Sequence, residues 1–173
     1  MALTDEQIQQ LWDKQAITEK LYLYCRGIDR MDREAVESVF WPDATDDHIK
    51  YVGTAAGAID YSFAACAKMR THHQLGNVLI AFVSATQATA ESYVHAYHEA
   101  EAIFGPQEMI FAARYLDRLE KRGDEWRVSH RKVVMDYYRT AAATANWEAG
   151  RYVRGPSRGE KKPADPLYDG AGG

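Results

Sequence analysis

The sequence has only two cysteines and no long hydrophobic run. Cys25 and Cys66 lie in helical patterns without Cys-x-x-Cys spacing, so we expect buried free thiols rather than a disulfide, a zinc site or a nucleophile. No run reaches the roughly 20 apolar residues that span a bilayer. The first residues, MALTDEQIQQ, are polar and acidic where a secretory signal is basic and then apolar. We therefore expect a cytoplasmic protein without membrane contact.

Basic charge is also limited. The chain has 21 Lys and Arg against 25 Asp and Glu, a net charge of -4, and a pI near 5.9. Phosphate binding needs clustered Lys and Arg, and no basic patch precedes the tail, so we expect no nucleic-acid partner. His95 and His98 are three apart on a predicted strand and face opposite sides. With no HExxH motif or carboxylate facial triad, we expect neither metal nor cofactor.

The chain contains helical patterns first and strand patterns afterwards. Thr4 and Gln7 form a capping-box start for a long helix, and Asp32 can cap a short second helix. A third helix follows Gly57, after a predicted strand HIKYVG. Four long segments rich in branched and aromatic residues then predict an antiparallel meander: 73–83, 88–104, 108–121 and 125–138.

This order is typical of an α+β fold with helices on one face of a sheet. Four long strands imply strong curvature, and a curved sheet closed by the first helix makes a cone with an interior cavity. We assign residues 1–149 to one domain of this kind. Residues 150–173 hold six of the 12 glycines and three of the five prolines, which indicates an arm. The arm is either a passive tail or a segment that covers a neighbouring subunit or the cavity mouth.

Adjacent residues on a strand point to opposite faces, so only one of His72 and His73 can face the cavity. From residue 72 onward, one row contains His73, Leu75, Asn77 and Leu79, and the other contains His72, Gln74, Gly76 and Val78. On the last strand, Trp126, Val128, His130, Lys132 and Val134 alternate with Arg127, Ser129, Arg131, Val133 and Met135. Periodicity alone leaves the inward row open on both strands.

Three stretches carry a resemblance to a known family: LYCRGIDRMDREAVESVFWPDA, THHQLGN and EWRVSHRKV. Together, over about residues 5 to 140, they resemble the SnoaL-like branch of the nuclear transport factor 2-like superfamily. That branch includes scytalone dehydratase, bile acid 7α-dehydratase and hexachlorocyclohexane dehydrochlorinase. The resemblance implies a cone-shaped α+β fold with three N-terminal helices on a strongly curved, mostly antiparallel sheet.

The resemblance also implies catalytic residues. It places Asp29 beside His73, with Arg131 nearby, and puts Tyr24 where the bile acid dehydratase has tyrosine and the dehydrochlorinase has lysine, which favours a hydroxyl over a chloride leaving group. Histidine can take a proton at neutral pH, and a neighbouring carboxylate stabilises the imidazolium. Asp29 would orient His73, which abstracts the proton. Arg131 would balance negative charge on the substrate, and Tyr24 would bond the departing hydroxyl.

Each candidate also has a purely structural interpretation. Asp29 can be a cap or turn residue, His73 a structural histidine, Arg131 a solvated or interface charge, and Tyr24 core packing. We assign His72 a structural role. Small residues on the predicted inward rows would leave volume for a bulky ligand. The candidate substrate pocket therefore contains His48, Val94, Ala96, His98, Phe111, Ala113 and Tyr115.

These features predict a cofactor-independent lyase, a dehydratase or similar enzyme, that acts on a hydrophobic aromatic or alicyclic small molecule through a His-Asp general base. An isomerase or a carbon-carbon lyase could use the same site. The alternatives from other classes are a noncatalytic scaffold, which resembles the small subunit of ring-hydroxylating dioxygenases, and a ligand-binding module. The open face of the sheet, with Tyr93, His95 and Tyr97, suggests a homo-oligomer, either a trimer or a dimer.

Overall fold

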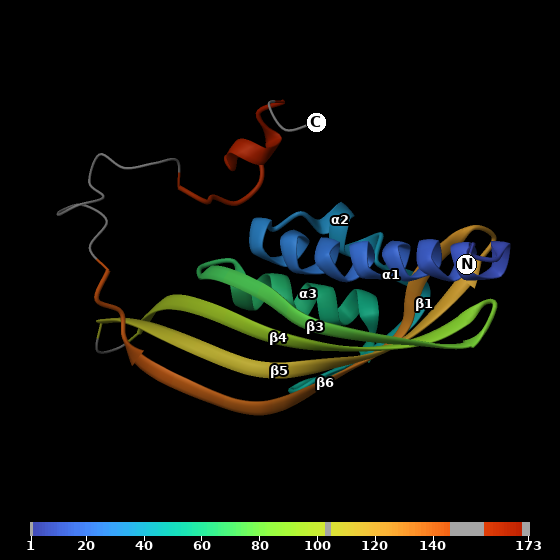
Figure 1. Cartoon of the computed structure of the whole chain (residues 1–173). Helices are drawn as coiled ribbons and strands as arrows, with labels where there is room; N and C mark the ends of the chain where they lie inside the picture. The colour runs from blue at the N-terminus through green and yellow to red at the C-terminus, as the bar shows by residue number, and fades with distance from the viewer. Residues whose placement is uncertain (1, 103–104, 146–157, 171–173) are drawn as a thin grey trace.

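The computed structural model describes residues 2–102, 105–145 and 158–170. Helices α1 (Asp5–Arg30), α2 (Arg33–Glu37) and α3 (Ala55–Cys66) pack on a six-stranded sheet, and a short 3-10 helix, η1 (Pro166–Tyr168), lies near the C-terminus. The strands are β1 (Phe40–His48), β2 (Tyr51–Thr54), β3 (Arg70–Ser84), β4 (Gln87–Ala102), β5 (Gly105–Arg122) and β6 (Glu125–Ala142). Their order is β2-β1-β6-β5-β4-β3, and only the β1 and β6 pair is parallel. Figure 1 shows α1 and α3 on the concave side of the curved sheet.

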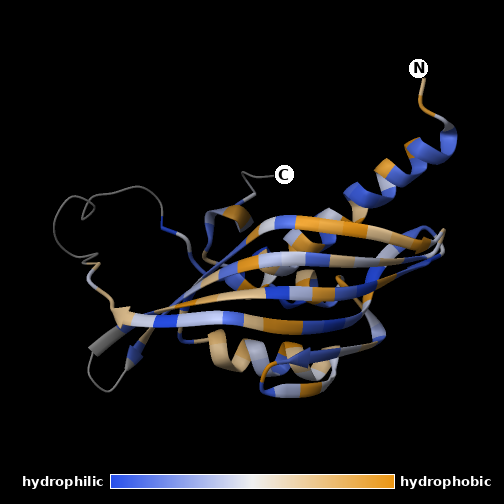
Figure 2. Ribbon diagram, turned by 60° about the horizontal axis from the view of Figure 1, so that its bottom comes forward, coloured by the Kyte–Doolittle hydropathy of each residue, from blue (hydrophilic) through white to orange (hydrophobic). Residues whose placement is uncertain are grey.

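The start and the end of α1 follow from local chemistry. The Thr4 hydroxyl accepts a hydrogen bond from the Gln7 backbone at 3.2 Å, and the Gln7 side chain accepts one from the Thr4 backbone at 3.0 Å. This confirms the predicted capping box. The helix ends at Met31, which has a left-handed backbone (φ 55°), and Asp32 caps α2 as predicted. Figure 2 shows the first turns of α1 projecting beyond the sheet, and Leu11 there is 56% exposed.

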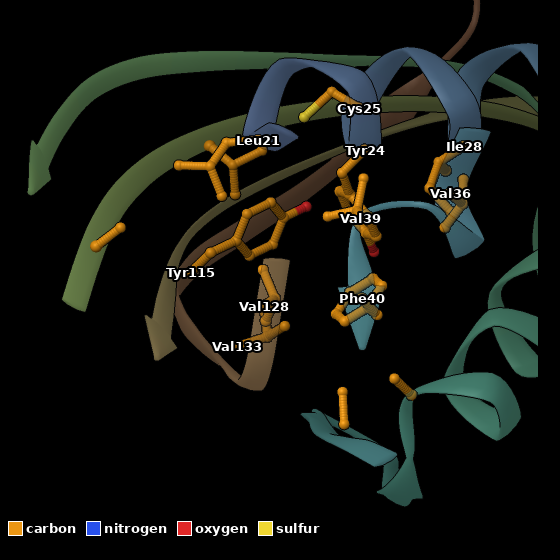
Figure 3. Close-up of a cluster of buried hydrophobic side chains, with 14 of the residues drawn as sticks. Leu21, Tyr24, Cys25, Ile28, Val36, Val39, Phe40, Tyr115, Val128 and Val133 are labelled. Atoms are coloured by element: carbon orange, nitrogen blue, oxygen red, sulfur yellow. The ribbon is translucent and has the colours of Figure 1, made fainter. Parts of the chain in front are cut away.

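The core lies between the sheet and the C-terminal half of α1. Figure 3 shows Leu21, Tyr24 and Ile28 of α1 pointing toward side chains from α2, β1, β5 and β6. The tightly buried members of this cluster include Ile17, Leu21, Val36, Val39, Leu119, Trp126 and Val128. Trp126 donates a hydrogen bond from its indole to Asp13 at 2.9 Å, so its polar edge is also satisfied. This packing fixes the last turns of α1 over the concave face.

One predicted strand was wrong. The segment HIKYVG was expected to form a single strand, but it spans the turn between β1 and β2. Ile49 takes a left-handed conformation (φ 59°), which reverses the chain and pairs His48 with Tyr51. β1 begins eight residues earlier than expected, at Phe40. The earlier start matters because it places Asp46 and His48 on the same side of one strand.

The inward rows also differ from simple alternation, because β-bulges interrupt two strands. On β3, the register shifts between Leu75 and Val78, so Thr71, His73 and Leu75 are followed by Val78, Ile80 and Phe82 as the more buried residues. On β6, the shift opposite Arg118 and Leu119 places Val128 and Arg131 on the buried side. Each bulge inserts an extra residue and exchanges the two rows. On both strands, therefore, the alternating rows written from the sequence hold only up to the bulge.

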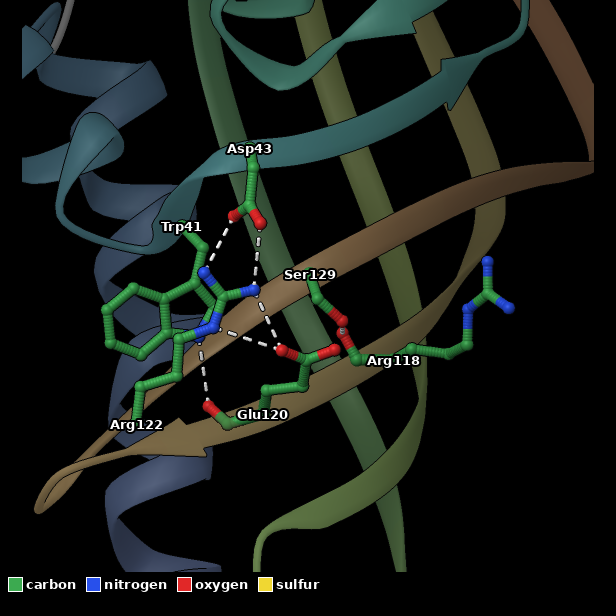
Figure 4. A network of polar contacts seen from close by, with 6 residues as sticks. All are labelled: Trp41, Asp43, Arg118, Glu120, Arg122 and Ser129. Carbon is green, nitrogen blue, oxygen red and sulfur yellow. Dashed lines mark hydrogen bonds and ion pairs between the residues drawn. The ribbon is translucent and has the colours of Figure 1, made fainter.

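A network of charged groups on the rim ties β1 to β5. Arg122 donates to both oxygens of Asp43 at 2.8 and 3.1 Å and to Glu120, while its guanidinium stacks on Trp41 at 4.8 Å. Figure 4 shows these groups converging above the strand that separates β1 from β5. Since both carboxylates are paired with the arginine and the arginine is stacked on an aromatic ring, we assign this cluster a structural role.

The C-terminal segment 158–170 packs against the end of α1. Arg30 donates to the Glu160 carbonyl at 2.9 Å and pairs with Asp165 at 3.1 Å, and the Lys162 backbone donates to the Arg30 carbonyl at 2.7 Å. The Lys161 ammonium donates to the Cys66 carbonyl at 2.7 Å, at the end of α3. A cation at a helix C-terminus is favourable. The rest of the expected arm, 150–157 and 171–173, and its predicted boundary lie outside the described residues.

Candidate active site

Asp29 and His73 are in direct contact at the junction of α1 and β3. The Asp29 Oδ1 atom lies 2.7 Å from His73 Nδ1, and Oδ2 accepts a hydrogen bond from the His73 backbone at 2.8 Å. The two side chains are 7% and 9% exposed. The carboxylate therefore holds both the ring and the backbone of His73. Among the described residues, no hydrogen bond reaches Nε2, so this nitrogen is available to a ligand.

The charge of Asp29 is set by two opposing effects. Burial raises the pKa of its carboxyl, but the hydrogen bonds and the charge of His73 lower it more, and the net pKa is below the usual value. Asp29 is therefore an anion at neutral pH. An anionic carboxylate stabilises an imidazolium at the contact distance seen here.

The His98 ring lies beside the ring of His73. The two imidazoles meet edge to face with centroids 5.2 Å apart, and His98 meets Phe111 in the same way at 5.1 Å. Burial lowers the pKa of His98 to about 4, and the electrostatic effect of the neighbouring imidazole adds to this. His98 is thus neutral at physiological pH. It carries an unpaired buried Nδ1 within the described chain, which a polar ligand could satisfy.

Arg131 is fully buried and paired with a residue that the sequence analysis missed. Its Nε and Nη2 atoms both donate to Asp117 at 2.8 Å, and its guanidinium packs between the rings of Tyr24 at 4.1 Å and Tyr115 at 4.3 Å. The side chains of Arg131 and Asp117 are 0% exposed. Only Nη1 has no partner in the described structure. The alternative of a solvated surface charge for Arg131 is excluded.

Tyr24 lies next to this ion pair on the inner face of α1. Its ring also contacts Phe40 and Tyr115 edge to face, with centroids 5.9 and 5.6 Å apart. Burial raises the pKa of its phenol far above the usual value. The hydroxyl therefore keeps its proton and acts as a hydrogen-bond donor. Tyr24 belongs to the hydrophobic core as well, so the packing role considered for it is present, and its role toward a substrate stays a prediction.

The other predicted pocket residues face inward. Val94, Ala96, Ala113 and Tyr115 are no more than 5% exposed and belong to the core cluster, and Phe111 packs against that cluster. His48 lies at the end of β1, with its Nδ1 atom 3.5 Å from Asp46 Oδ1. Contact of these side chains with a ligand stays a prediction.

Several buried polar atoms on the inner face lack a partner among the described residues. Buried polar groups in proteins are nearly always hydrogen-bonded, so a group of unpaired ones is typical of a binding surface. They come from three strands of the sheet, β1, β4 and β6, so polar groups lie along more than one part of the concave face. The atoms are Asp46 Oδ1, His48 Nδ1, Ser92 Oγ, His98 Nδ1 and Arg131 Nη1.

Two pockets reach Asp29 from different sides. One, of about 380 Å³, lies between α1 and β3 and includes both Asp29 and His73 in its lining. The other, of about 620 Å³, is bounded by the start of β3 on one side and by the C-terminal segment 159–164 on the other, and it also reaches Asp29. The C-terminal segment therefore borders an opening beside Asp29.

The described residues show no group of three His, Cys, Asp or Glu side chains placed to hold a metal ion. Cys25 and Cys66 are both buried and free, as predicted. Burial raises the pKa of Cys25 to about 12 and also raises that of Cys66, so neither forms a thiolate readily. Across the described ranges, no helix is long and apolar enough to cross a membrane.

The sequence analysis missed Asp46 and Asp117. Asp117 follows Phe111, Ala113 and Tyr115 at every second position of β5, and an acidic residue in such an apolar row was a usable signal. Asp46 precedes His48 by two residues, but the predicted strand began at His48, which concealed their shared face. In both cases the sequence analysis named one residue of the pair, Arg131 or His48, and did not predict the carboxylate that lies beside it.

The chain belongs to the family of SnoaL-like domains, which it matches over residues 9–132. The fold is accordingly the nuclear transport factor 2-like cone, as predicted. Searching curated protein sequences finds no match.

Solved structures share the architecture at low identity. A hexachlorocyclohexane dehydrochlorinase, LinA type 2, superposes with a TM-score of 0.72 at 23% identity, over 80% of this chain and 95% of that one. A scytalone dehydratase-like protein from Novosphingobium aromaticivorans gives 0.67 at 21%, over 80% and 92%. A protein from the same organism described as an aromatic ring hydroxylase gives 0.64 at 21%, over 77% and 94%. Lyases are thus among the proteins that share this fold.

Proposed function

We propose that this protein is a cofactor-independent lyase that removes water, or a similar leaving group, from a hydrophobic small molecule. The observation that carries the proposal is the contact between Asp29 and His73. The carboxylate accepts from both the ring and the backbone of one histidine, and two pockets reach Asp29, one of which also reaches His73. An oriented base of this kind contributes on the order of 10² to 10⁴ in rate.

The proposed reaction starts with proton abstraction by His73 Nε2 from a carbon next to an activating group. Asp29 stabilises the imidazolium that forms. Arg131 Nη1 and the neutral ring of His98 face the negative charge that develops on the substrate, and Tyr24 donates a hydrogen bond to the leaving group. The aromatic and aliphatic inner residues, Phe111, Val94 and Ala113 among them, favour an aromatic or alicyclic substrate. Isomerisation and carbon-carbon cleavage begin with the same proton transfer.

The first experiment screens hydroxylated aromatic and steroid-like compounds for elimination products by mass spectrometry. His73→Gln should lower turnover of any converted compound by about 10² to 10⁴. His95→Gln is the control, because its ring is on the exposed face of β4 and lines neither pocket that reaches Asp29. Both variants should keep the thermal unfolding midpoint of the wild type. Full activity of His73→Gln contradicts the assignment, and ligand binding without turnover in the wild type supports the noncatalytic alternative.

We also propose that the protein is a homo-oligomer that buries the convex face of its sheet. Leu79, Val83, Tyr93 and Tyr137 are 65%, 68%, 44% and 55% exposed there, and exposed apolar residues on one face are typical of interfaces. Figure 2 shows apolar residues recurring along these long strands. Tyr93→Glu should lower the mass measured by light scattering, whereas Val52→Glu, on β2, should not. An unchanged mass in Tyr93→Glu contradicts this interface.

A further inference from the structure

A second imidazole and carboxylate pair lies on the opposite wall of the interior. Asp46 and His48 are two residues apart on β1 and therefore share its inner face. Asp46 is 2% exposed, and its Oδ1 atom lies 3.5 Å from His48 Nδ1. Neither atom has a hydrogen-bond partner in the part of the chain that the structure describes. A buried carboxylate oxygen without a partner is costly, so the fold alone gives no reason for this pair.

The last turns of α1 connect this pair to the proposed site. Asp46 is the register partner of Arg131, whose guanidinium lies 4.1 Å from the Tyr24 ring. Tyr24 and Asp29 are five residues apart on α1, which is about 7.5 Å along the helix axis. Asp29 in turn contacts His73 on β3. The two pairs therefore lie on the two sides of the Tyr24–Asp29 stretch of α1, one on β1 and the other on β3.

The proposed elimination needs a proton on the departing oxygen, since hydroxide is a poor leaving group. Tyr24 bonds that oxygen but holds its own proton tightly, because burial raises the pKa of its phenol. Arg131 is committed to Asp117 through two nitrogens and does not release a proton in proteins. An imidazole is the side chain that gives and takes protons near neutral pH, and His48 is the one beside a buried carboxylate on this wall.

We propose that His48 is the proton donor to the leaving group, with Asp46 as the carboxylate that stabilises its charged form. This inference rests on the proposed elimination. His73 takes the proton from carbon, and the C–H electron pair becomes the new carbon-carbon π bond. The C–O bond breaks with both electrons moving to oxygen, which takes a proton from His48 and leaves as water. His73 then releases its proton and His48 regains one by exchange with solvent.

The test compares two leaving groups on one carbon skeleton. The probes are the β-hydroxy ketone formed from benzaldehyde and acetone and the matching β-chloro ketone, which both yield benzylideneacetone, a product followed by its absorbance. Chloride departs without a proton, whereas hydroxide needs one. We expect His48→Gln and Asp46→Asn to slow the hydroxy ketone by at least about 10² and the chloro ketone by less than about threefold. His95→Gln, on the exposed face of β4, is the control.

The outcomes separate the inference from the proposed function. His73→Gln should stop both reactions, because both begin with the same proton abstraction. If His73→Gln stops both while His48→Gln slows the two ketones equally, His48 is not the proton donor and the base assignment stands. If His73→Gln converts both at the wild-type rate, or the wild type converts neither, the proposed function itself fails and the role of His48 falls with it. Circular dichroism of each variant identifies one that has lost its fold, and Asp46→Asn then serves in place of His48→Gln.

Discussion

Two carboxylate pairs in the interior differ in how completely the protein surrounds them. We call the Asp117–Arg131 pair the closed pair and the Asp29–His73 pair the open pair. Asp117 accepts hydrogen bonds from two nitrogens of Arg131 in a fully buried bidentate contact. The Arg131 guanidinium packs between the rings of Tyr24 and Tyr115. The Asp29 carboxylate contacts only one ring nitrogen of His73, and Asp29 lines two pockets. The first pair holds a buried cation whose contacts are almost all made within the protein, and the second leaves a histidine beside two pockets. Under the proposed function, the first pair positions neighbouring groups and the second takes part in the reaction.

The largest effect should come from breaking the closed pair. Asp117→Ala leaves the guanidinium of Arg131 buried without its anion, which costs about 3 to 5 kcal/mol of the free energy of unfolding. Urea denaturation of the purified variant measures this loss. The double variant Asp117→Leu with Arg131→Met should recover most of it, because neither charge then remains buried. A loss below about 1 kcal/mol in Asp117→Ala would show that water reaches the pair.

The next effect concerns His98, the neutral neighbour of the open pair. Its pKa of about 4 in the folded protein lies below the unfolded value of about 6.5. Between these values the unfolded chain binds the extra proton, so stability falls as the pH drops from 6.5 to 4, by about 3 kcal/mol at most. His98→Gln should flatten this part of the stability curve measured by thermal unfolding. His95→Gln, exposed on the other face of β4, should leave the curve unchanged, and an unchanged curve in His98→Gln would contradict the burial of a neutral ring.

The smallest effect should come from the open pair itself. Asp29→Ala removes the acceptor of two hydrogen bonds and should cost about 1 to 3 kcal/mol, whereas Asp29→Asn keeps an acceptor for the His73 backbone and should cost less. Because the pKa of Asp29 is lowered in the folded protein, its contribution is present above the unfolded pKa of about 3.9 and disappears as the pH falls through the lower folded value. Denaturation at pH 7 and at acid pH measures both. Equal losses at both pH values would rule out an anionic Asp29.

Sequence reasoning predicted local features well where one strong local signal was present. The capping box at Thr4 and Gln7 and the cap at Asp32 are short-range chemistry, and both are present in the structure. The four long strands were also found, because branched and aromatic residues recur over each of them. The inner rows were not fully predictable, since a single extra residue at a bulge exchanges the faces without leaving a clear pattern in the sequence.

The sequence by itself determined that helices come first and four long strands afterwards, the family, and the residues Asp29, His73, Arg131 and Tyr24 as candidates. Only the tertiary structure decided which partners these residues meet. Asp117 reaches Arg131 because the pairing of β5 with β6 makes the two residues register partners, and Asp46 lies beside Arg131 because β1 pairs with β6 in parallel. Backbone propensity acts over a few residues, whereas such contacts depend on strand register and curvature, which are set by the packing of the whole chain.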